Sequence, residues 1–176
     1  MARTKKKATK RARLRVGVAG WDYKDWRGIV YPHPRPRGFD PVRYLAGYID
    51  CIEINSTFYR PPRPAVAEGW AERVADCRGF RFTAKLWRRF THERETSWKK
   101  AESKAVRAGL TPLLEAGRLS ALLAQFPWSF KNNETSREWI EDVRRAFADF
   151  PLVIEVRHAS WNEPDFFAWL AEQGVG

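Results

Sequence analysis

The chain has 176 residues, of which 44% are hydrophobic, and its 32 Lys and Arg against 21 Asp and Glu give a net charge of +11. A single domain with a sizeable hydrophobic core is the default for such a chain, and a largely disordered protein is excluded. The sequence has no signal peptide, and no apolar run approaches the roughly 18–20 residues of a membrane helix. Its two cysteines are too few for a disulfide framework or a zinc site. The sequence therefore predicts a cytoplasmic protein without a membrane segment.

The first 13 residues hold seven cationic side chains and no acidic one, and removing these charges leaves +4 on the remaining 163 residues. Because this segment cannot bury apolar area, we predict a disordered basic tail over residues 1–13 and one folded domain over residues 14–176. The tail predicts weak contact with the phosphates of a nucleic acid, and a solubilising extension without a ligand explains it at least as well.

Five short runs rich in β-branched or aliphatic residues predict five strands. Their starts lie 37, 29, 39 and 33 residues apart. This spacing fits a strand followed by a crossover helix and does not fit hairpins. The predicted strands are residues 14–19, 51–55, 80–85, 119–125 and 152–157.

Helix signals lie between and after these strands. Asp40 followed by Pro41 is typical of an N-cap and a first helical position. A helix between residues 98 and 115 is expected in two pieces, because Gly109 and Pro112 interrupt it. The other three helices are expected to begin at Pro64, at the capping-box pair Thr135 and Glu138, and at the pair Ser160 and Glu163.

This alternation of strands and helices predicts a parallel sheet flanked by helices. Two architectures fit it. An open doubly wound sheet of five strands would be complete in this length, whereas a (β/α) barrel usually takes about 250 residues and would be cut short.

The two faces of the predicted strands differ in polarity. In the second strand, Ile52 and Ile54 share one face while Glu53 and Asn55 share the other. Four of the five strands place a polar group near their carboxyl end, opposite an apolar face. Parallel sheets covered on both sides usually read apolar throughout, so the pattern favours a barrel with a polar mouth. The residues expected to converge there are Glu53, Asn55, Lys85, Gln125, Glu155 and Arg157.

Four of these residues are predicted to be catalytic. Lys85 and Arg157 would hold an anion, and Glu53 or Glu155 would act as the general acid or base. A structural network of ion pairs inside the barrel explains the same residues without catalysis, and this alternative stays open.

Large aromatic residues follow each predicted strand, and such rings either stack on sugars and nucleobases or simply fill the barrel mouth. His92 and His158 lie in the loops after the third and fifth strands, where each is either an acid–base group or a packed, hydrogen-bonded side chain. No HxH, HExxH or CxxC spacing occurs, so we predict neither a metal nor a cofactor. The predicted substrate-binding residues are Asn55, Gln125, Trp21, Tyr59, His92, His158 and Trp161.

Five segments carry motifs in a fixed order: Gly20-Trp21-x-Tyr23-Lys24-x-Trp26 with Tyr31-Pro32, Glu53-Ile54-Asn55-Ser56-Thr57-Phe58-Tyr59, Phe82-x-Ala84-Lys85 with Thr91-His92, Gln125-Phe126-Pro127, and Glu155-Val156-Arg157-His158-x-Ser160-Trp161. Together they resemble the YecE-like family, also known as domain of unknown function 72. The resemblance implies a TIM-barrel-like fold. It implies no reaction, because the family is uncharacterised, and the likeness of its barrel to sugar-phosphate isomerases and apurinic-site endonucleases concerns the fold alone.

Members of that family continue beyond the fifth helix, so the resemblance implies a TIM-barrel-like fold truncated after about five βα units. Because an open sheet leaves a strand edge unpaired, we expect this chain alone to be poorly stable or to need a partner. The function expected for the intact family is an enzyme of hydrolase or isomerase type, acting on a phosphate- or sugar-containing substrate at the barrel mouth. The alternatives are a nucleic-acid-binding protein without catalysis and an inactive truncated fragment.

Overall fold

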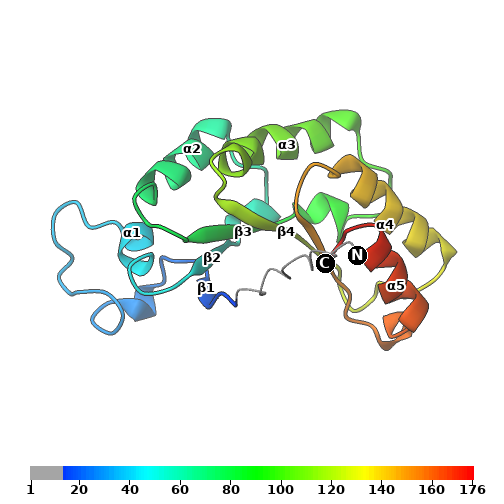
Figure 1. Cartoon of the computed structure of the whole chain (residues 1–176), viewed down its shortest axis with the longest axis horizontal. Coiled ribbons are helices and arrows are strands. Elements are labelled where there is room, and N and C mark those ends of the chain that lie inside the picture. Colours follow the sequence, from blue (N-terminus) through cyan, green and yellow to red (C-terminus); the bar gives the residue numbers. More distant parts are fainter. Residues whose placement is uncertain (1–13) are drawn as a thin grey trace, which may run out of the picture.

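The computed structural model describes residues 14–176, so the basic tail predicted over residues 1–13 lies outside them. Its five strands form one parallel sheet in the order β1-β2-β3-β4-β5. The strands are β1 (Gly17–Ala19), β2 (Cys51–Ile54), β3 (Arg81–Lys85), β4 (Leu119–Gln125) and β5 (Leu152–Glu155). The helices are α1 (Pro41–Leu45), α2 (Pro64–Arg73), α3 (Lys100–Glu115), α4 (Glu134–Ala146) and α5 (Pro164–Glu172) (Figure 1).

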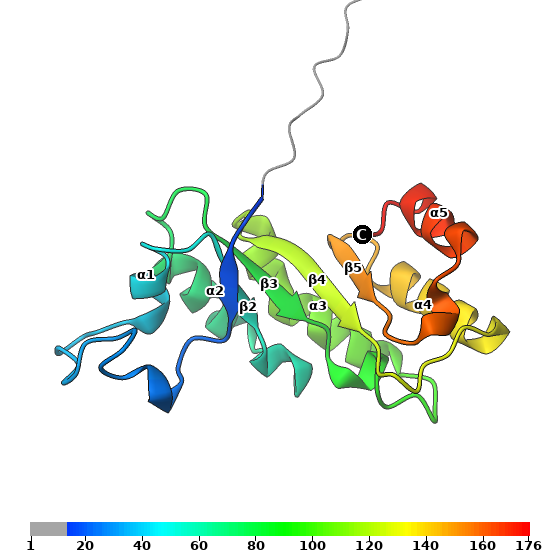
Figure 2. The same ribbon diagram turned by 90° about the horizontal axis from the view of Figure 1, so that it is seen from below.

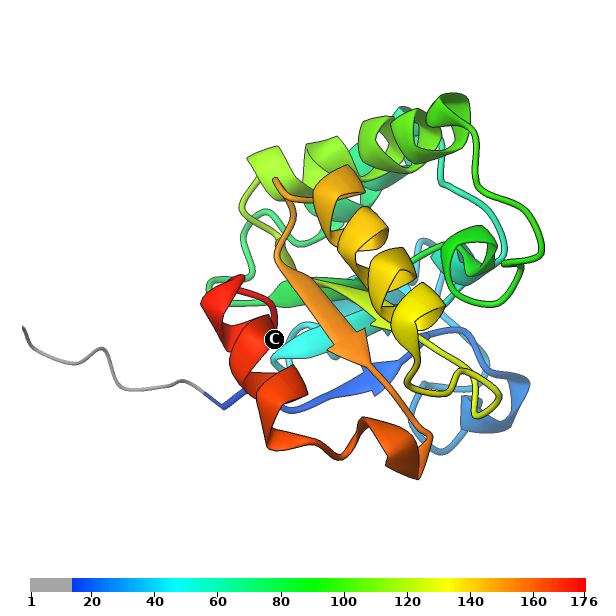
Figure 3. The same cartoon turned by 90° about the vertical axis from the view of Figure 1, so that its right-hand side faces the viewer.

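The order of the strands decides between the two predicted architectures. A doubly wound sheet reverses its strand order at one point and carries helices on both faces. Here the spatial order equals the chain order throughout. The strands lie side by side in Figure 2 with α2 and α3 behind them, and Figure 3 shows α2, α3 and α4 along the outside of a curved sheet. The fold is therefore TIM-barrel-like, as predicted, and contains five consecutive βα units.

Burial of the side chains alternates along each inner strand, as expected for a sheet that helices cover on one face only. In β2, Ile52 and Ile54 are fully buried while Glu53 between them is half-buried. In β3, Phe82 is fully buried and Thr83 is half-buried. The buried side chains face the helices, and the half-buried side chains form the concave inner face of the sheet, as the polarity pattern indicated.

Two of the predicted helix starts are confirmed. Asp40 caps α1, because its carboxylate accepts hydrogen bonds from the backbone N–H groups of Val42 at 2.9 Å and Arg43 at 3.2 Å. Pro64 is the first residue of α2, where its missing N–H costs nothing.

Two other predicted starts are wrong. Asn133 caps α4 in place of Thr135, because its side-chain oxygen accepts a hydrogen bond from the N–H of Ser136 at 2.8 Å. Ser160 lies inside a 3-10 turn, Ala159–Trp161, so α5 begins later, after Glu163.

The two-piece prediction for the third helix is also wrong, since α3 is continuous from Lys100 to Glu115. Pro112 cannot donate to the carbonyl of Ala108, but Ala108 is exposed and water can bind this carbonyl. Gly109 is buried where α3 passes the β2–α2 loop. A Cβ added at Gly109 would collide with the carbonyl oxygen of Pro62. The glycine is therefore a packing residue and does not break the helix.

The last residues of the chain, after α5, lie beside β5. The N–H of Ile154 donates to the carbonyl of Gly176 at 2.9 Å, and the N–H of Gly176 donates to the carbonyl of Leu152 at 3.2 Å. This is the pattern of parallel pairing. None of the helices in residues 14–176 is long and apolar enough to cross a membrane.

The close approach at Gly109 gives a stability prediction. Gly109→Ala should lower the free energy of unfolding by about 1–3 kcal/mol, because the added methyl group must displace the backbone at Pro62. Gly69→Ala in α2 is the matched control. No atom lies within 4 Å of a Cβ built there, so alanine should stabilise the helix by about 0.5–1 kcal/mol. Urea denaturation measures both, and stabilisation by both substitutions would contradict the packing role of Gly109.

Candidate active site at the carboxyl end of the sheet

Polar side chains from four adjacent βα units form one continuous chain of contacts at the carboxyl end of the sheet. Glu53 Oε1 lies 3.5 Å from Lys85 Nζ, and Lys85 Nζ lies 3.5 Å from Gln125 Oε1. Gln125 Nε2 donates to Glu155 Oε2 at 2.6 Å, and Arg157 Nε donates to Glu155 Oε1 at 2.9 Å. The structure thus brings together five of the six polar residues predicted to converge at the mouth, and we call them the mouth network.

The register of the sheet explains this convergence. Glu53 pairs with Thr83, which lies two residues before Lys85 on the same face of β3. Lys85 in turn pairs with Leu123, two residues before Gln125 in β4. The polar position therefore advances along the chain from β2 to β4, as the stagger of a barrel requires. Neighbouring polar side chains meet diagonally, within reach of their long side chains.

Charge within the mouth network is balanced. The Glu53 and Lys85 side chains are each 23% exposed and form one pair, while Glu155 and Arg157 form the other. Burial raises the pKa of Glu155. Hydrogen bonds from Gln125 and Arg157, together with the positive charges of Arg157 and Lys85, outweigh this effect and lower its pKa overall. Glu155 is therefore ionised near neutral pH.

A cavity of about 390 Å³ opens beside the mouth network, within the usual size range of small-molecule sites. Its polar lining includes Lys85 and Gln125 from the network and Asn55 from the β2–α2 loop. Asn55 Oδ1 is buried, and among the described residues it has no hydrogen-bond partner. The rest of the lining is aromatic and consists of Tyr23, Phe58 and Tyr59. The sixth predicted mouth residue, Asn55, and the predicted binding residue Tyr59 therefore both face this cavity.

Two predicted binding residues lie away from the cavity. Trp161 is 1% exposed, and its indole N–H donates to the carbonyl of Phe130 at 2.7 Å. This burial contradicts the predicted substrate contact, because the 3-10 turn after β5 folds the ring back into the core. Trp21 is half-buried and packs edge-to-face on Trp70 at 5.9 Å, so it too serves packing.

The two predicted histidines lie near the mouth and are both held by local contacts. His158 Nδ1 accepts a hydrogen bond from the N–H of Ser160 at 3.1 Å, and its ring lies 4.9 Å from that of Trp128. His92 Nδ1 lies 2.9 Å from Thr91 Oγ1, and its ring stands perpendicular to Phe58 at 5.0 Å. Through Phe58, His92 contacts the wall of the cavity.

The environment of His92 keeps its imidazole neutral. Burial lowers its pKa, and the positive charges of nearby arginines lower it further, while Glu93 acts in the opposite direction. These arginines are Arg88, Arg94 and Arg157.

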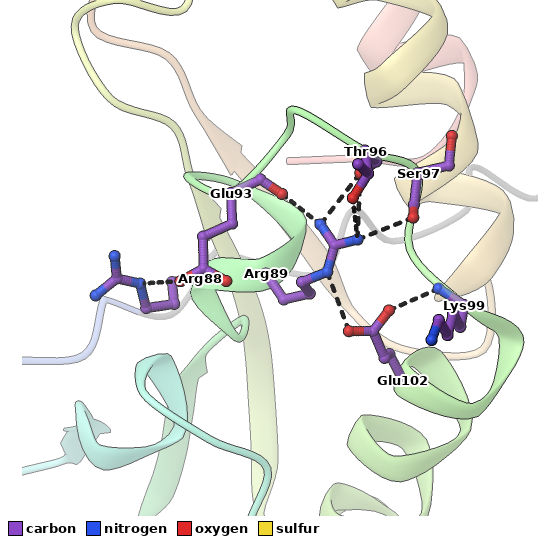
Figure 4. Close-up of polar contacts among 7 residues, drawn as sticks. All are labelled: Arg88, Arg89, Glu93, Thr96, Ser97, Lys99 and Glu102. Atoms are coloured by element: carbon purple, nitrogen blue, oxygen red, sulfur yellow. Dashed lines mark hydrogen bonds and ion pairs between the residues drawn. The ribbon is translucent and has the colours of Figure 1, made fainter.

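One arginine that the sequence analysis missed holds the β3–α3 loop, which carries His92 (Figure 4). Arg89 donates to the Glu102 carboxylate at 3.0 Å, to the Ser97 carbonyl at 2.9 Å, to the Thr96 carbonyl at 3.2 Å and to the Glu93 carbonyl. Its side chain is 13% exposed. Because its partners are mostly backbone carbonyls, no residue pattern in the sequence could have revealed this role.

Among residues 14–176, no three His, Cys, Asp or Glu side chains lie close enough together to hold a metal ion.

The cavity wall also contains Tyr23 and Phe58, which were not among the predicted binding residues.

Comparison with known proteins places these features in a family context. The family model described as "Protein of unknown function DUF72" matches residues 15–176. The UPF0759 protein YunF of Bacillus subtilis is 25% identical over 156 residues, which cover 86% of this chain and 53% of YunF. This chain therefore spans about half the length of that relative.

Two solved structures are similar to the fold. A DUF72 family protein from Thermotoga maritima is 29% identical with a TM-score of 0.71, covering 92% of this chain and 62% of that one. A D-psicose 3-epimerase solved in the presence of D-fructose is 14% identical with a TM-score of 0.50, covering 76% of this chain and 54% of that one. At this identity the epimerase is similar in fold alone.

The contacts of Arg89 predict a large effect for a conservative substitution. Arg89→Lys keeps the charge, but one ammonium group cannot reach all the loop oxygens, so the free energy of unfolding should fall by about 2–3 kcal/mol. Arg145→Lys is the control, because Arg145 is 67% exposed in its ion pair with Glu141 and should change stability by less than about 0.5 kcal/mol. Equal effects in urea denaturation would show that other contacts hold the loop.

His92 predicts a pH dependence of stability. Its pKa is lowered in the folded protein, so the unfolded chain binds the proton more readily and folding loses stability as the pH falls through about 6.5. His92→Gln should remove this contribution. The stability lost between pH 7.5 and 5.5 should therefore be smaller in the variant than in the original protein, and an unchanged loss would contradict the assignment.

Proposed function

The chain belongs to the DUF72 family of proteins of unknown function, and we propose that its barrel is an enzyme that performs acid–base chemistry on a sugar- or phosphate-containing substrate. The observation that carries the proposal is the continuous mouth network, which links two carboxylates and two cations beside a cavity of about 390 Å³. Perturbed and paired titratable groups beside a cavity are typical of active sites.

Each charged residue of the network has a role in this proposal. Glu155 is the base, because its carboxylate is ionised and is held at the mouth by Gln125 and Arg157. Glu53, which lies beside Lys85, is the second proton-transfer group. The ammonium of Lys85 and the guanidinium of Arg157 stabilise negative charge that develops on a substrate oxygen. Hydrolytic and isomerising reactions of sugars both need proton transfers of this kind.

One structural neighbour supports a sugar as the substrate. The D-psicose 3-epimerase was solved with D-fructose present, and it places a sugar reaction on a similar fold. Since folds host many reactions, this support is an analogy, and the mouth network itself remains the main argument.

Nucleic-acid binding without catalysis is the second candidate, and the exposed aromatic side chains near the mouth favour it. Tyr59 and Trp128 are both largely exposed, and Arg60 follows Tyr59 directly. Rings and guanidinium groups of this kind form stacking surfaces for unpaired bases. This candidate predicts binding without any turnover, and such binding should weaken steeply as salt is added.

Turnover by a Glu155 variant tests the first proposal. The protein is incubated in D₂O with aldoses, ketoses and their phosphates, and NMR follows product formation and deuterium uptake. Glu155→Gln keeps the shape of the side chain and its contact with Gln125, so turnover should fall by about 10²–10⁴-fold while the free energy of unfolding stays near its original value. Glu163→Gln is the control, since Glu163 is exposed in its pair with Arg137 and should leave turnover unchanged. Unfolding of the Glu155 variant would instead favour a purely structural network.

A further inference from the structure

We propose that the mouth cavity binds an uncharged sugar and selects against its phosphate esters. This inference rests on the proposed function in so far as it places the ligand in the cavity beside the mouth network. Three properties of the site support it: the pairing of the network cations, an unpaired buried acceptor and the aromatic part of the cavity wall.

Both cations of the mouth network are already engaged by protein groups. Lys85 pairs with Glu53 and Arg157 pairs with Glu155, so the network has no net charge. A phosphate group carries about −1.5 to −2 charges near neutral pH and finds no unpaired cation in the network. Unless a cation changes partner, the network offers such an anion no net attraction.

The β3–α3 loop adds no free cation to the cavity. Arg88 pairs with Glu93 at 2.7 Å, and Arg89 donates to loop carbonyls and to Glu102 (Figure 4). Arg94 lies with its guanidinium 4.3 Å from the ring centre of Phe130, and neither residue lines the cavity.

One buried hydrogen-bond acceptor in the cavity wall has no partner among the described residues. It is Oδ1 of Asn55, which lines the cavity. An unsatisfied buried acceptor costs about 1–3 kcal/mol, so a donor that reaches it gains affinity. Hydroxyl groups supply such donors, whereas phosphate oxygens near neutral pH mainly accept.

The aromatic wall suits the C–H face of a sugar ring. Phe58 and Tyr59 meet edge to face at 5.3 Å, and both line the cavity with Tyr23. Tyr59 is 67% exposed, so its ring is open to a ligand. A flat apolar surface next to an unpaired buried acceptor matches a polyhydroxylated ring, which is apolar on its faces and polar at its edge.

Ligand titrations of the 176-residue protein test this inference. The probes are D-fructose, D-glucose and D-ribose, the 6-phosphates of the two hexoses, D-ribose 5-phosphate, and inorganic phosphate, and binding is followed by saturation-transfer NMR and calorimetry. At least one free sugar should bind, with its phosphate ester at least tenfold weaker, and inorganic phosphate should not compete. Binding by none of the free sugars, or tighter binding of the esters, would overturn the inference.

Variants locate the binding and identify its chemistry. Tyr59→Ala should weaken sugar binding about tenfold through loss of the stacking surface. Tyr48→Ala is the matched control, because Tyr48 is 74% exposed and precedes β2, at the opposite end of the sheet from the cavity. Arg94→Gln should leave sugar affinity unchanged. Equal effects of the two tyrosine substitutions, or loss of binding in the Arg94 variant, would contradict the proposed site.

The two proposals fail in different ways. Binding of a free sugar without any turnover leaves the ligand assignment standing and removes the proposed catalysis. Turnover that is confined to phosphorylated sugars, and is lost in Glu155→Gln, supports catalysis and overturns the choice of an uncharged ligand.

Discussion

The site depends on the ability of one amide to donate and accept at the same time. Gln125 accepts from Lys85 and donates to Glu155, and so joins the Glu53–Lys85 and Glu155–Arg157 pairs into one unit. Each ion pair alone would be neutral, but its remaining polar atoms would have only water as a hydrogen-bond partner. Joined through Gln125, four charges from neighbouring βα units hold one another beside a cavity, where an isolated carboxylate would be costly to desolvate.

Such a network is possible because the helices cover only one face of the sheet. Apolar side chains such as Ile52 and Phe82 supply the burial that stabilises the sheet, and they all face the helices. The concave face is then free to carry polar groups such as Glu53 and Lys85 without interrupting the core. The apolar core and the polar mouth network thus lie on opposite faces of the same strands, and the register of the sheet brings the polar positions of neighbouring strands within reach of one another.

The sequence predicts most of this arrangement because it follows from local periodicity. Alternation within 51–55 and 152–157 assigns Glu53 and Glu155 to the inner face without any knowledge of the helices. Tertiary contacts decide the features that the sequence did not predict. The continuity of α3 depends on where Pro62 lies, and the burial of Trp161 depends on the turn after β5. The role of Arg89 depends on carbonyls that every residue has, and Asn133 and Thr135 are both good caps, so sequence preference cannot choose between them.

The contact between Gly109 and Pro62 links the far side of the molecule to the cavity. Pro62 follows Tyr59 by three residues in the β2–α2 loop, so a helix that does not line the cavity packs against the loop that carries the aromatic wall. Under the proposed function, the affinity for a ligand would therefore depend on a glycine outside the binding surface. A larger side chain at Gly109 would require a compensating shift of the loop.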